Sequence, residues 1–195
     1  MLARLKFLSS EILLGTMIAV LSALAAFSSY QGSMADGDQA QYTVEGQQML
    51  TDANAEYLSA NQMIVYDYSL FDGYYTAETD EKTEYYRSSF SEELQTSMDA
   101  NEEDPFSDAY YEAMYAEPNQ MFEDADAKFS KAQEFNERGD ALQMVMLISA
   151  LALAFAAWAS LLNSESPVRL VFAILAIVMT FYSFILYFNV PTVIA

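Results

Sequence analysis

Acidic side chains are the residues of this sequence whose types could do chemistry, because carboxylate oxygens bind hard cations such as Ca²⁺. Asp52, Asn54 and Glu56 alternate as they would at the start of an EF-hand calcium loop. Such a loop needs glycine at its sixth position and a bidentate acid at its twelfth, where this chain has Tyr57 and Met63. We therefore interpret this stretch as one face of a helix.

A second acidic group, Glu102, Glu103 and Asp104, falls in a predicted loop and is the better candidate for a weak metal site. A specific calcium site needs about six to eight converging oxygens, and runs of charge are usually solvated surface. Two interpretations of this group stay open, a cation site and plain surface.

The chain has no cysteine and no histidine. Their absence excludes disulfides, metal sites or haem ligation built on either residue, and catalysis that depends on a thiolate or an imidazole. The sequence also lacks a glycine-rich phosphate loop, a nucleophile elbow and a metallohydrolase helix. Spacing does not exclude a catalytic pair of carboxylates, but nothing singles out one pair. We therefore expect no enzyme activity, no catalytic residue and no cofactor.

Three nearly uncharged runs cover residues 12–30, 141–163 and 170–188. Each is close to the roughly 20 residues with which a helix crosses a hydrocarbon core of about 30 Å. The sequence therefore predicts an integral membrane protein with three transmembrane helices. Polar side chains inside the runs are mostly hydroxyls and no charge lies at a centre, which argues against an ion pathway or a transporter.

Nearly all of the acidic residues lie between the first two runs. Residues 31–140 hold 26 acidic and 5 basic residues, a formal charge of −21, while the rest of the chain sums to +1. Such a surface repels phosphate groups. This charge argues against anionic lipid as a partner of the segment, and nucleic-acid binding is excluded.

The topology follows from the few basic residues near the runs. Arg4 and Lys6 precede the first run, and basic residues of short loops stay on the cytoplasmic side. Residues 23–25 (ALA) resemble a signal-peptidase site. Because the chain begins at Met1, we expect the first run to be an uncleaved signal anchor instead.

This topology places the N-terminus in the cytoplasm and the acidic segment outside. Arg169, between the second and third runs, agrees with a cytoplasmic loop. The predicted order is a cytoplasmic N-terminus (1–11), transmembrane helix 1 (12–30), an acidic extracytoplasmic helical domain (31–140), transmembrane helix 2 (141–163), a cytoplasmic loop (164–169), transmembrane helix 3 (170–188) and an extracytoplasmic tail (189–195).

Helical periodicity occurs at both ends of the acidic segment. Apolar and small residues recur there with the seven-residue spacing of helices that pack on one another. We therefore expect an antiparallel coiled-coil stalk, with one helix leaving the membrane and the other returning. The first seam is formed by Leu50, Ala53, Tyr57, Ala60, Ile64 and Phe71, and the second by Phe122, Ala125, Phe129, Ala132 and Gly139.

Between the two stalk helices the sequence predicts a helical cap. Asp72-Gly73 ends the first stalk helix, and Asp104-Pro105 fits an N-cap followed by proline at the first helical position. Shorter helices are predicted over residues 81–98 and 105–116, and Pro118 separates them from the returning helix. No strand-like alternation persists, so the predicted fold class is all-α.

Ten tyrosines lie between residues 57 and 115, several of them as adjacent pairs. Neighbouring residues on a helix point about 100° apart, so a pair cannot bury both rings in one narrow seam. Exposed tyrosine is common at protein interfaces. Two interpretations stay open, a binding surface and the boundary of a small core that is poor in leucine.

Small residues at four-residue spacing occur in the transmembrane runs, where they permit close helix contacts. Contacts within the chain and contacts with a partner are both compatible with this spacing. The residues are Gly15, Ala19 and Ala23 in the first run, Ala150, Ala152, Ala154 and Ala156 in the second, and Ala176 with Thr180 in the third.

Two short stretches carry a family resemblance, residues 53–60 (ANAEYLSA) and residues 135–143 (FNERGDALQ). Together with the order of one span, a helical segment and a closing pair of spans, they resemble an uncharacterised family of prokaryotic three-span membrane proteins, a domain of unknown function. Members tend to carry tryptophan, lysine and histidine in the corresponding helices, where this chain has Tyr57, acidic residues and no histidine. The resemblance implies an architecture and no activity.

The featureless transmembrane runs and the acidic, tyrosine-rich domain favour one class of function. We expect a non-catalytic accessory or scaffold subunit of a membrane protein complex. Its expected partners are other membrane subunits or a second copy of the chain, together with the lipid bilayer. The alternative is an extracytoplasmic cation-binding or sensor protein that uses its acidic cap.

Overall fold

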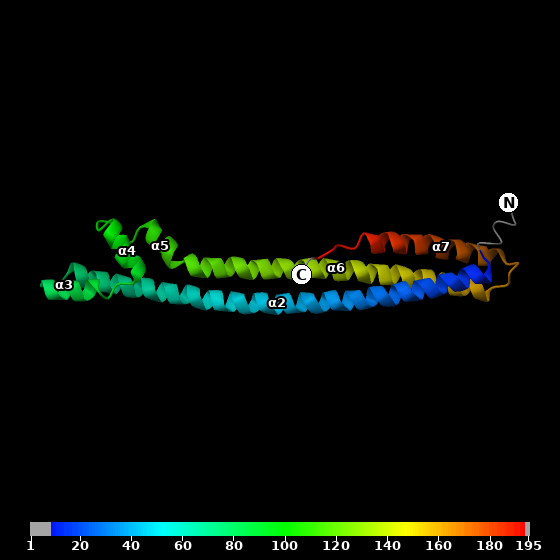
Figure 1. Ribbon diagram of the computed structural model, residues 1–195, viewed down its shortest axis with the longest axis horizontal. Coiled ribbons are helices and arrows are strands. Elements are labelled where there is room, and N and C mark those ends of the chain that lie inside the picture. Colours follow the sequence, from blue (N-terminus) through cyan, green and yellow to red (C-terminus); the bar gives the residue numbers. More distant parts are fainter. Residues whose placement is uncertain (1–8, 194–195) are drawn as a thin grey trace. The chain divides into compact units, whose positions relative to one another are not determined.

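The computed structural model describes residues 9–193, which form α-helices and contain no β-strand. The all-α fold class predicted from the sequence is therefore confirmed. Arg4 and Lys6, on which the predicted topology depends, lie outside the described residues, as do the last two residues of the predicted tail. The helices, labelled in Figure 1, are α2 (Glu11–Tyr75), α3 (Asp80–Arg87), α4 (Glu92–Ala100), α5 (Asp108–Met114), α6 (Ala116–Leu161) and α7 (Pro167–Phe188).

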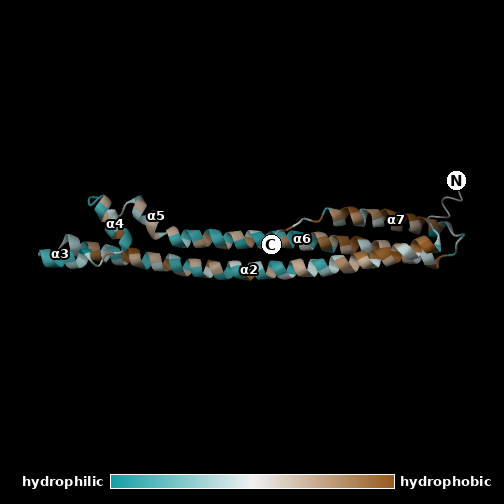
Figure 2. Ribbon diagram, viewed as in Figure 1, coloured by the Kyte–Doolittle hydropathy of each residue, from teal (hydrophilic) through white to brown (hydrophobic). Residues whose placement is uncertain are grey.

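Three of these helices, α2, α6 and α7, are long and apolar enough to cross a membrane. Figure 2 shows hydrophobic residues along α7 and along one end of α2 and of α6. The helices cover the predicted transmembrane runs, except that α6 ends at Leu161, two residues before the second run does. α7 begins with Pro167. Proline has no N–H, but no hydrogen bond is lost here because the first N–H groups of a helix lack intrahelical partners.

The chain forms two compact units. The apolar unit contains Met1–Tyr42 and Ser130–Ala195, and the acidic unit contains Thr43–Phe129. α2 continues from one unit into the other through residues 31–49, for which periodicity had given no prediction. No proline precedes Pro105 in the sequence, so nothing in that stretch forces the helix to end.

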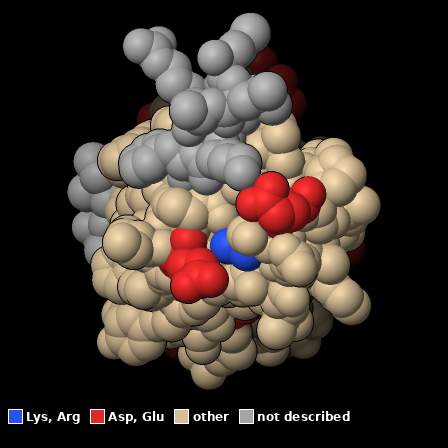
Figure 3. All heavy atoms as spheres, turned by 90° about the vertical axis from the view of Figure 1, so that its right-hand side faces the viewer, with Lys and Arg blue, Asp and Glu red and all other residues tan. Residues whose placement is uncertain are grey.

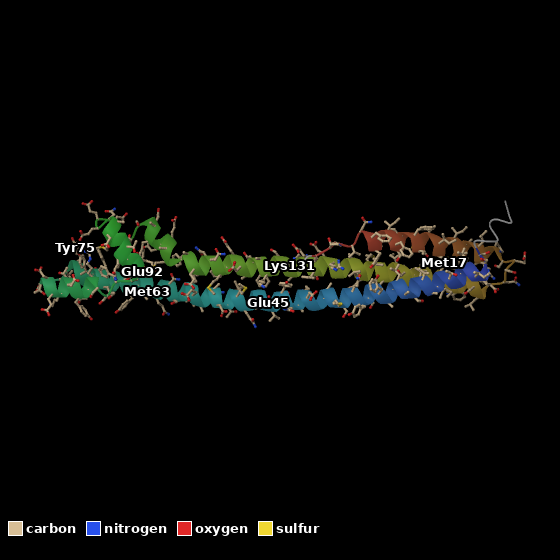
Figure 4. The ribbon with its side chains drawn as sticks, in the orientation of Figure 1. Met17, Glu45, Met63, Tyr75, Glu92 and Lys131 are labelled. Atoms are coloured by element: carbon tan, nitrogen blue, oxygen red, sulfur yellow. The ribbon has the colours of Figure 1, made fainter. Side chains whose placement is uncertain are left out.

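Small residues let the three long helices of the apolar unit approach closely. Ala152 and Ala156 of α6 and Ala176 of α7 are fully buried, in one cluster with residues of α2 that include Met17, labelled in Figure 4. The hydroxyls of Ser149 on α6 and Ser183 on α7 are hydrogen-bonded at 2.5 Å. Contacts within the chain therefore use part of the predicted small-residue spacing.

Arg169 ties together three segments of the apolar unit and is only 4% exposed. Its Nε donates to the carbonyl of Ser9 at 3.1 Å, and its Nη1 donates to the carbonyl of Leu162 at 2.9 Å. Carbonyls at a helix end lack intrahelical partners, so the guanidinium satisfies a group that the end of α6 leaves open. Figure 3 shows this end of the molecule, where a small basic area lies among acidic and uncharged ones.

In the acidic unit, α2 and α6 pack along part of the predicted seam. Ala53 and Ala60 of α2 are buried in it. Gly46 makes room for Phe129 of α6, because a Cβ at this glycine would lie 3.0 Å from the phenylalanine ring. Small residues on α2 thus accept large rings from α6.

The predicted helix over residues 81–98 is wrong, since this stretch forms two helices, α3 and α4. The hydroxyls of Ser88 and Ser89 both donate to the carbonyl of Tyr85, and Ser91 caps α4. Serine side chains that bond nearby backbone groups compete with helix continuation, which explains the break.

The predicted N-cap at Asp104-Pro105 is also wrong, because α5 begins only after Ser107. Pro105 is buried, and the ring of Phe106 packs against Tyr68 with centroids 4.3 Å apart. This dipeptide therefore anchors the loop in the core instead of starting a helix.

The two long helices end and begin slightly differently from the prediction. α2 continues through Asp72-Gly73 to Tyr75, because a helical glycine costs only about 1 kcal/mol and this one leaves room for the ring of Tyr86. Pro118 lies inside the first turn of α6, where its missing N–H leaves no bond unmade.

Gly73→Ala is expected to lower the free energy of unfolding of the acidic unit by about 1–3 kcal/mol, because an added Cβ would lie 2.4 Å from the Tyr86 ring and displace it. Gly37→Ala is the matched control. No atom lies within 4 Å of a Cβ there, so alanine should stabilise its helix by up to about 1 kcal/mol. Thermal melting of the chain in detergent, followed by circular dichroism, measures both variants. Shifts of the same sign would contradict the packing of Tyr86 on Gly73.

Candidate functional site

The cap of the acidic unit, residues 60–115, is the part of the molecule where polar and aromatic side chains gather around a core. It packs α4 and α5 against the end of α2. Figure 4 labels Tyr75 at that end of α2 and Glu92 at the start of α4. Burial of each large apolar side chain stabilises the cap by about 1.5–3 kcal/mol. The buried residues are Ala60, Ile64, Leu70, Phe90, Leu94, Met98, Tyr110 and Met114.

One carboxylate, that of Asp67 on α2, is fully buried in the cap. Its Oδ1 accepts the N–H of Ser91 at 3.0 Å, and its Oδ2 accepts the hydroxyls of Ser91 at 2.5 Å and Tyr110 at 2.8 Å. A buried carboxylate is tolerated only with such donors, because it has left the water that would otherwise solvate it. These bonds join α2 to the start of α4 and to α5.

The Ser91 side chain makes hydrogen bonds to two helices, α4 and α2. Its hydroxyl oxygen accepts the N–H of Leu94 at 3.1 Å as the N-cap of α4, while its hydroxyl hydrogen is donated to Asp67. Glu92 and Glu93 follow in the first turn, where negative charge is favourable near the positive end of the helix dipole. This arrangement cannot be recognised in the sequence, because a serine before two acids in an acidic chain is not distinctive.

Several tyrosine hydroxyls hold the cap together. Tyr115 donates to the Asn61 side chain at 2.8 Å, and the hydroxyls of Tyr68 and Tyr111 bond to each other. Tyr110, as described above, donates to Asp67. These contacts favour the interpretation as residues of a small core for Tyr110, Tyr111 and Tyr115, while Tyr68 stays 45% exposed.

Other tyrosines stay exposed. Tyr66 is 56% exposed, Tyr75 is 79% exposed and Tyr85 is 67% exposed. Two of them belong to adjacent pairs in which the partner ring, Tyr74 or Tyr86, is partly buried. In these two pairs one ring stays exposed, as predicted, whereas in the pair of Tyr110 and Tyr111 one ring is buried and the other is partly buried.

The bonded phenols are held in their protonated form. Burial, and next the hydrogen bond to Asp67, raises the pKa of Tyr110 far above its ordinary value near 10. The hydrogen bond with Tyr68 raises the pKa of Tyr111 to about 12. The bond to Glu102 raises the pKa of Tyr74, and burial raises that of Tyr115. At neutral pH these groups act as hydrogen-bond donors.

The three candidate metal ligands, Glu102, Glu103 and Asp104, lie in the exposed turn between α4 and α5. The Glu102 carboxylate accepts the hydroxyl of Tyr74 at 2.9 Å. The backbone N–H groups of Glu103 and Asp104 both donate to Asn101. Within residues 9–193, no group of three or more acidic side chains is placed to hold an ion. A cation site in this turn stays a prediction.

The calcium-loop pattern that begins at Asp52 lies inside α2. The side-chain amide of Asn54 donates to the carbonyl of Leu50 at 2.7 Å, as a polar residue on a helix surface can. The interpretation of this stretch as a helix face is confirmed.

A shallow groove of about 320 Å³ lies between α4 and α5. Its lining includes the small residues Ala100, Ala109 and Ala113. Glu92 and Glu93 contribute acidic groups to it. The other lining residues are Thr96, Ser97, Asn101, Ser107 and Tyr110.

Comparisons of the chain with models of protein families, with curated proteins and with solved structures found no match in any of the three. The resemblance of residues 53–60 and 135–143 to an uncharacterised three-span family stays a prediction.

Ser91→Ala is expected to destabilise the cap by about 1–3 kcal/mol, because it removes an N-cap and one donor to the buried Asp67 carboxylate. Ser107→Ala is the matched control, since Ser107 is also an N-cap residue but makes no capping side-chain bond. Its effect should stay within about 0.5 kcal/mol. Denaturant titration of both variants measures the difference. Equal losses would show that the bond to Asp67 contributes nothing.

The stability of the acidic unit is expected to fall as the pH rises above about 10. Tyrosine in the unfolded chain ionises near pH 10, whereas the pKa of folded Tyr111 is about 12 and that of Tyr110 is also raised. Between about pH 10 and about pH 12 the folded state binds more protons than the unfolded state does, so the free energy of unfolding decreases as the pH rises. Below about pH 9 these groups should leave the stability unchanged.

Melting temperature measured against pH, together with tyrosinate absorbance, checks this expectation. Tyr110→Phe should flatten the alkaline slope, and Tyr85→Phe, which changes an exposed ring, should not. If all 14 tyrosines titrate together near pH 10, the hydrogen bonds assigned to Tyr110 and Tyr111 are wrong.

Proposed function

We propose that this chain is a non-catalytic accessory or scaffold subunit of a membrane protein complex. The observation that carries the proposal is the exposure of Tyr66, Tyr75 and Tyr85 on a cap whose interior is fixed by its own hydrogen bonds. Tyrosine rings bury a large area with only two rotatable side-chain bonds, which suits them to bind another protein.

The charge of the acidic unit defines the kind of partner surface that it fits. The unit carries 21 acidic residues against Lys82, Arg87 and Lys128. Opposite charge accelerates encounter and suppresses the approach of like-charged proteins. The proposed partner therefore presents a basic surface with room for aromatic rings, and the groove between α4 and α5 offers a place for one of its side chains.

Open faces on the transmembrane helices support the same proposal. Gly15, Ala19 and Ala23 are exposed on α2, as are Ala150 and Ala154 on α6. Faces of small residues let a neighbouring membrane helix approach closely, and packing within the chain leaves these two uncovered.

The proposed orientation places the N-terminus in the cytoplasm and residues 31–140 outside, in the plasma membrane of a prokaryote, with the first helix as an uncleaved signal anchor. Arg4 and Lys6 precede the first helix, and loops rich in Lys or Arg stay inside. The acidic segment contains few basic residues to oppose its translocation. It would form an acidic ectodomain with a coiled-coil stalk.

We expect gentle solubilisation from native membranes to yield a stoichiometric assembly of this chain with other polypeptides, measured by native mass spectrometry. A variant with Tyr66, Tyr75 and Tyr85 changed to serine should lose about tenfold in co-purified partner, since a tenfold loss in affinity is only about 1.4 kcal/mol. Tyr30→Ser is the control, because Tyr30 is equally exposed but belongs to the apolar unit. Recovery of the 21.9 kDa chain alone, or of a pure oligomer of it, would overturn the proposal.

A further inference from the structure

One face of α2 in the acidic unit remains uncovered by the rest of the chain. It lies opposite the buried seam of Ala53, Ala60 and Ile64. Its residues recur at alternating spacings of four and three, the pattern of a helix that packs against another helix. We call these eight residues the open face of α2: Val44, Gln48, Thr51, Ala55, Leu58, Gln62, Val65 and Ser69, all of them exposed.

Every second residue of the open face lies seven residues from the next one in that series. Three of these four residues have exposed apolar side chains. Val44 is 56% exposed, Leu58 is 60% exposed and Val65 is 67% exposed, with Thr51 completing the series at seven-residue spacing. A shallow hollow lies at its beginning, beside Val44 and Thr51. Single exposed apolar residues are ordinary on a protein surface, but a regular row of them along about 38 Å of helix is the pattern of a packing seam.

The open face also carries no charge, although the acidic unit has 21 acidic residues. Glu45 and Asp52 lie at one edge of the open face, about 80° around the helix from its centre, and Asp52 also lines the hollow beside Val44, while Glu56 lies farther around. Asp67 is buried beneath Ser91 on the other side of α2, and Asp72 comes only after the last position of the face. The acidic residues of this helix thus stop at the edges of the open face.

The lack of charge decides between the possible occupants. A basic partner would be attracted by the acidic surfaces of the unit. The uncharged open face offers it no electrostatic attraction. A second copy of this chain carries the same formal charge of −20, so it is repelled elsewhere and can approach closely only across a face without charge. Acidic groups on the far sides of the two helices are screened, because the Debye length is about 8 Å at physiological salt.

We propose that two copies of this chain pair in parallel through the open face of α2. Copies inserted the same way in one membrane bring identical residues together, so Leu58 meets Leu58 and Val65 meets Val65. Gln48 and Gln62 then face their own counterparts, and side-chain amides can donate and accept across the pair, which fixes the register. Confinement to one membrane raises the effective concentration, so a seam of modest apolarity suffices.

The pairing uses α2 alone and does not depend on the proposed function, although the open face runs into the cap, where Tyr66 follows Val65 directly. A complex that contains two copies of the chain and other polypeptides satisfies both proposals. A pure dimer satisfies this one and overturns the accessory function. A complex of one copy of the chain with other polypeptides satisfies the accessory function and overturns the pairing.

Cysteine cross-linking tests the pairing directly, because the natural chain has no cysteine. Leu58→Cys or Val65→Cys in the full-length chain, reconstituted in lipid vesicles and treated with a mild oxidant, should give a disulfide-linked dimer. A disulfide forms only where the two Cα atoms come within about 7 Å, which a parallel pair achieves along its seam. Ala127→Cys, at an exposed position of α6 in the same unit, is the matched control and should stay monomeric.

The expected result is a dimer from both open-face variants and at least tenfold less from Ala127→Cys. Equal cross-linking of all three, or none at Leu58 and Val65, would overturn the proposal. A link from position 58 to another polypeptide in native membranes would also overturn it.

A disulfide can also capture copies that meet only transiently, so a second measurement tests the pairing without a covalent bond. Leu58→Glu combined with Val65→Glu places two charges per copy in the seam and should lower the dimer fraction of the cysteine-free chain by at least tenfold in analytical ultracentrifugation. Circular dichroism should show unchanged helicity, since both side chains are exposed. Ala127→Glu adds a charge outside the face and should leave the dimer unchanged. A monomeric wild-type chain would refute the pairing without any variant.

Discussion

The hydrogen bonds to the buried Asp67 carboxylate are the interaction on which the acidic unit depends. A carboxylate inside a protein needs donors, and this one takes them from Ser91 and Tyr110, on two other elements of the cap. The short helices α4 and α5 contain nine and seven residues, lengths that are marginal in isolation. Their attachment to Asp67, together with the apolar core around Tyr110, is what makes them part of a folded cap.

Charge sets a second constraint, which determines how the surface can be used. Most faces of the acidic unit repel another molecule of the same kind and attract a basic one. The open face of α2 is the exception, because it is uncharged and has the spacing of a packing helix. The exposed rings of Tyr75 and Tyr85 and the open face therefore suit different occupants, whereas Tyr66 follows Val65 of the open face directly.

Much of the architecture could be predicted from the sequence, because apolar length and helical period are local properties of the chain. Three membrane-length helices, the all-α class and the seam through Ala53 and Ala60 were predicted. Two helix starts in the cap were not, because Ser91 bonds to Asp67 and Phe106 packs on Tyr68, contacts between residues distant in sequence. Asp67 was missed for the same reason, since its sequence neighbours do not distinguish it from the other acidic residues.

The hydrogen bonds of Arg169 have a consequence for the biosynthesis of the protein. Arg169 lies in the first turn of α7, and it is translated 160 residues after Ser9, whose carbonyl it binds. The carbonyls of Ser9 and Leu162 therefore cannot contact this guanidinium until the start of α7 has been translated. A chain released before residue 169 lacks the side chain that joins them.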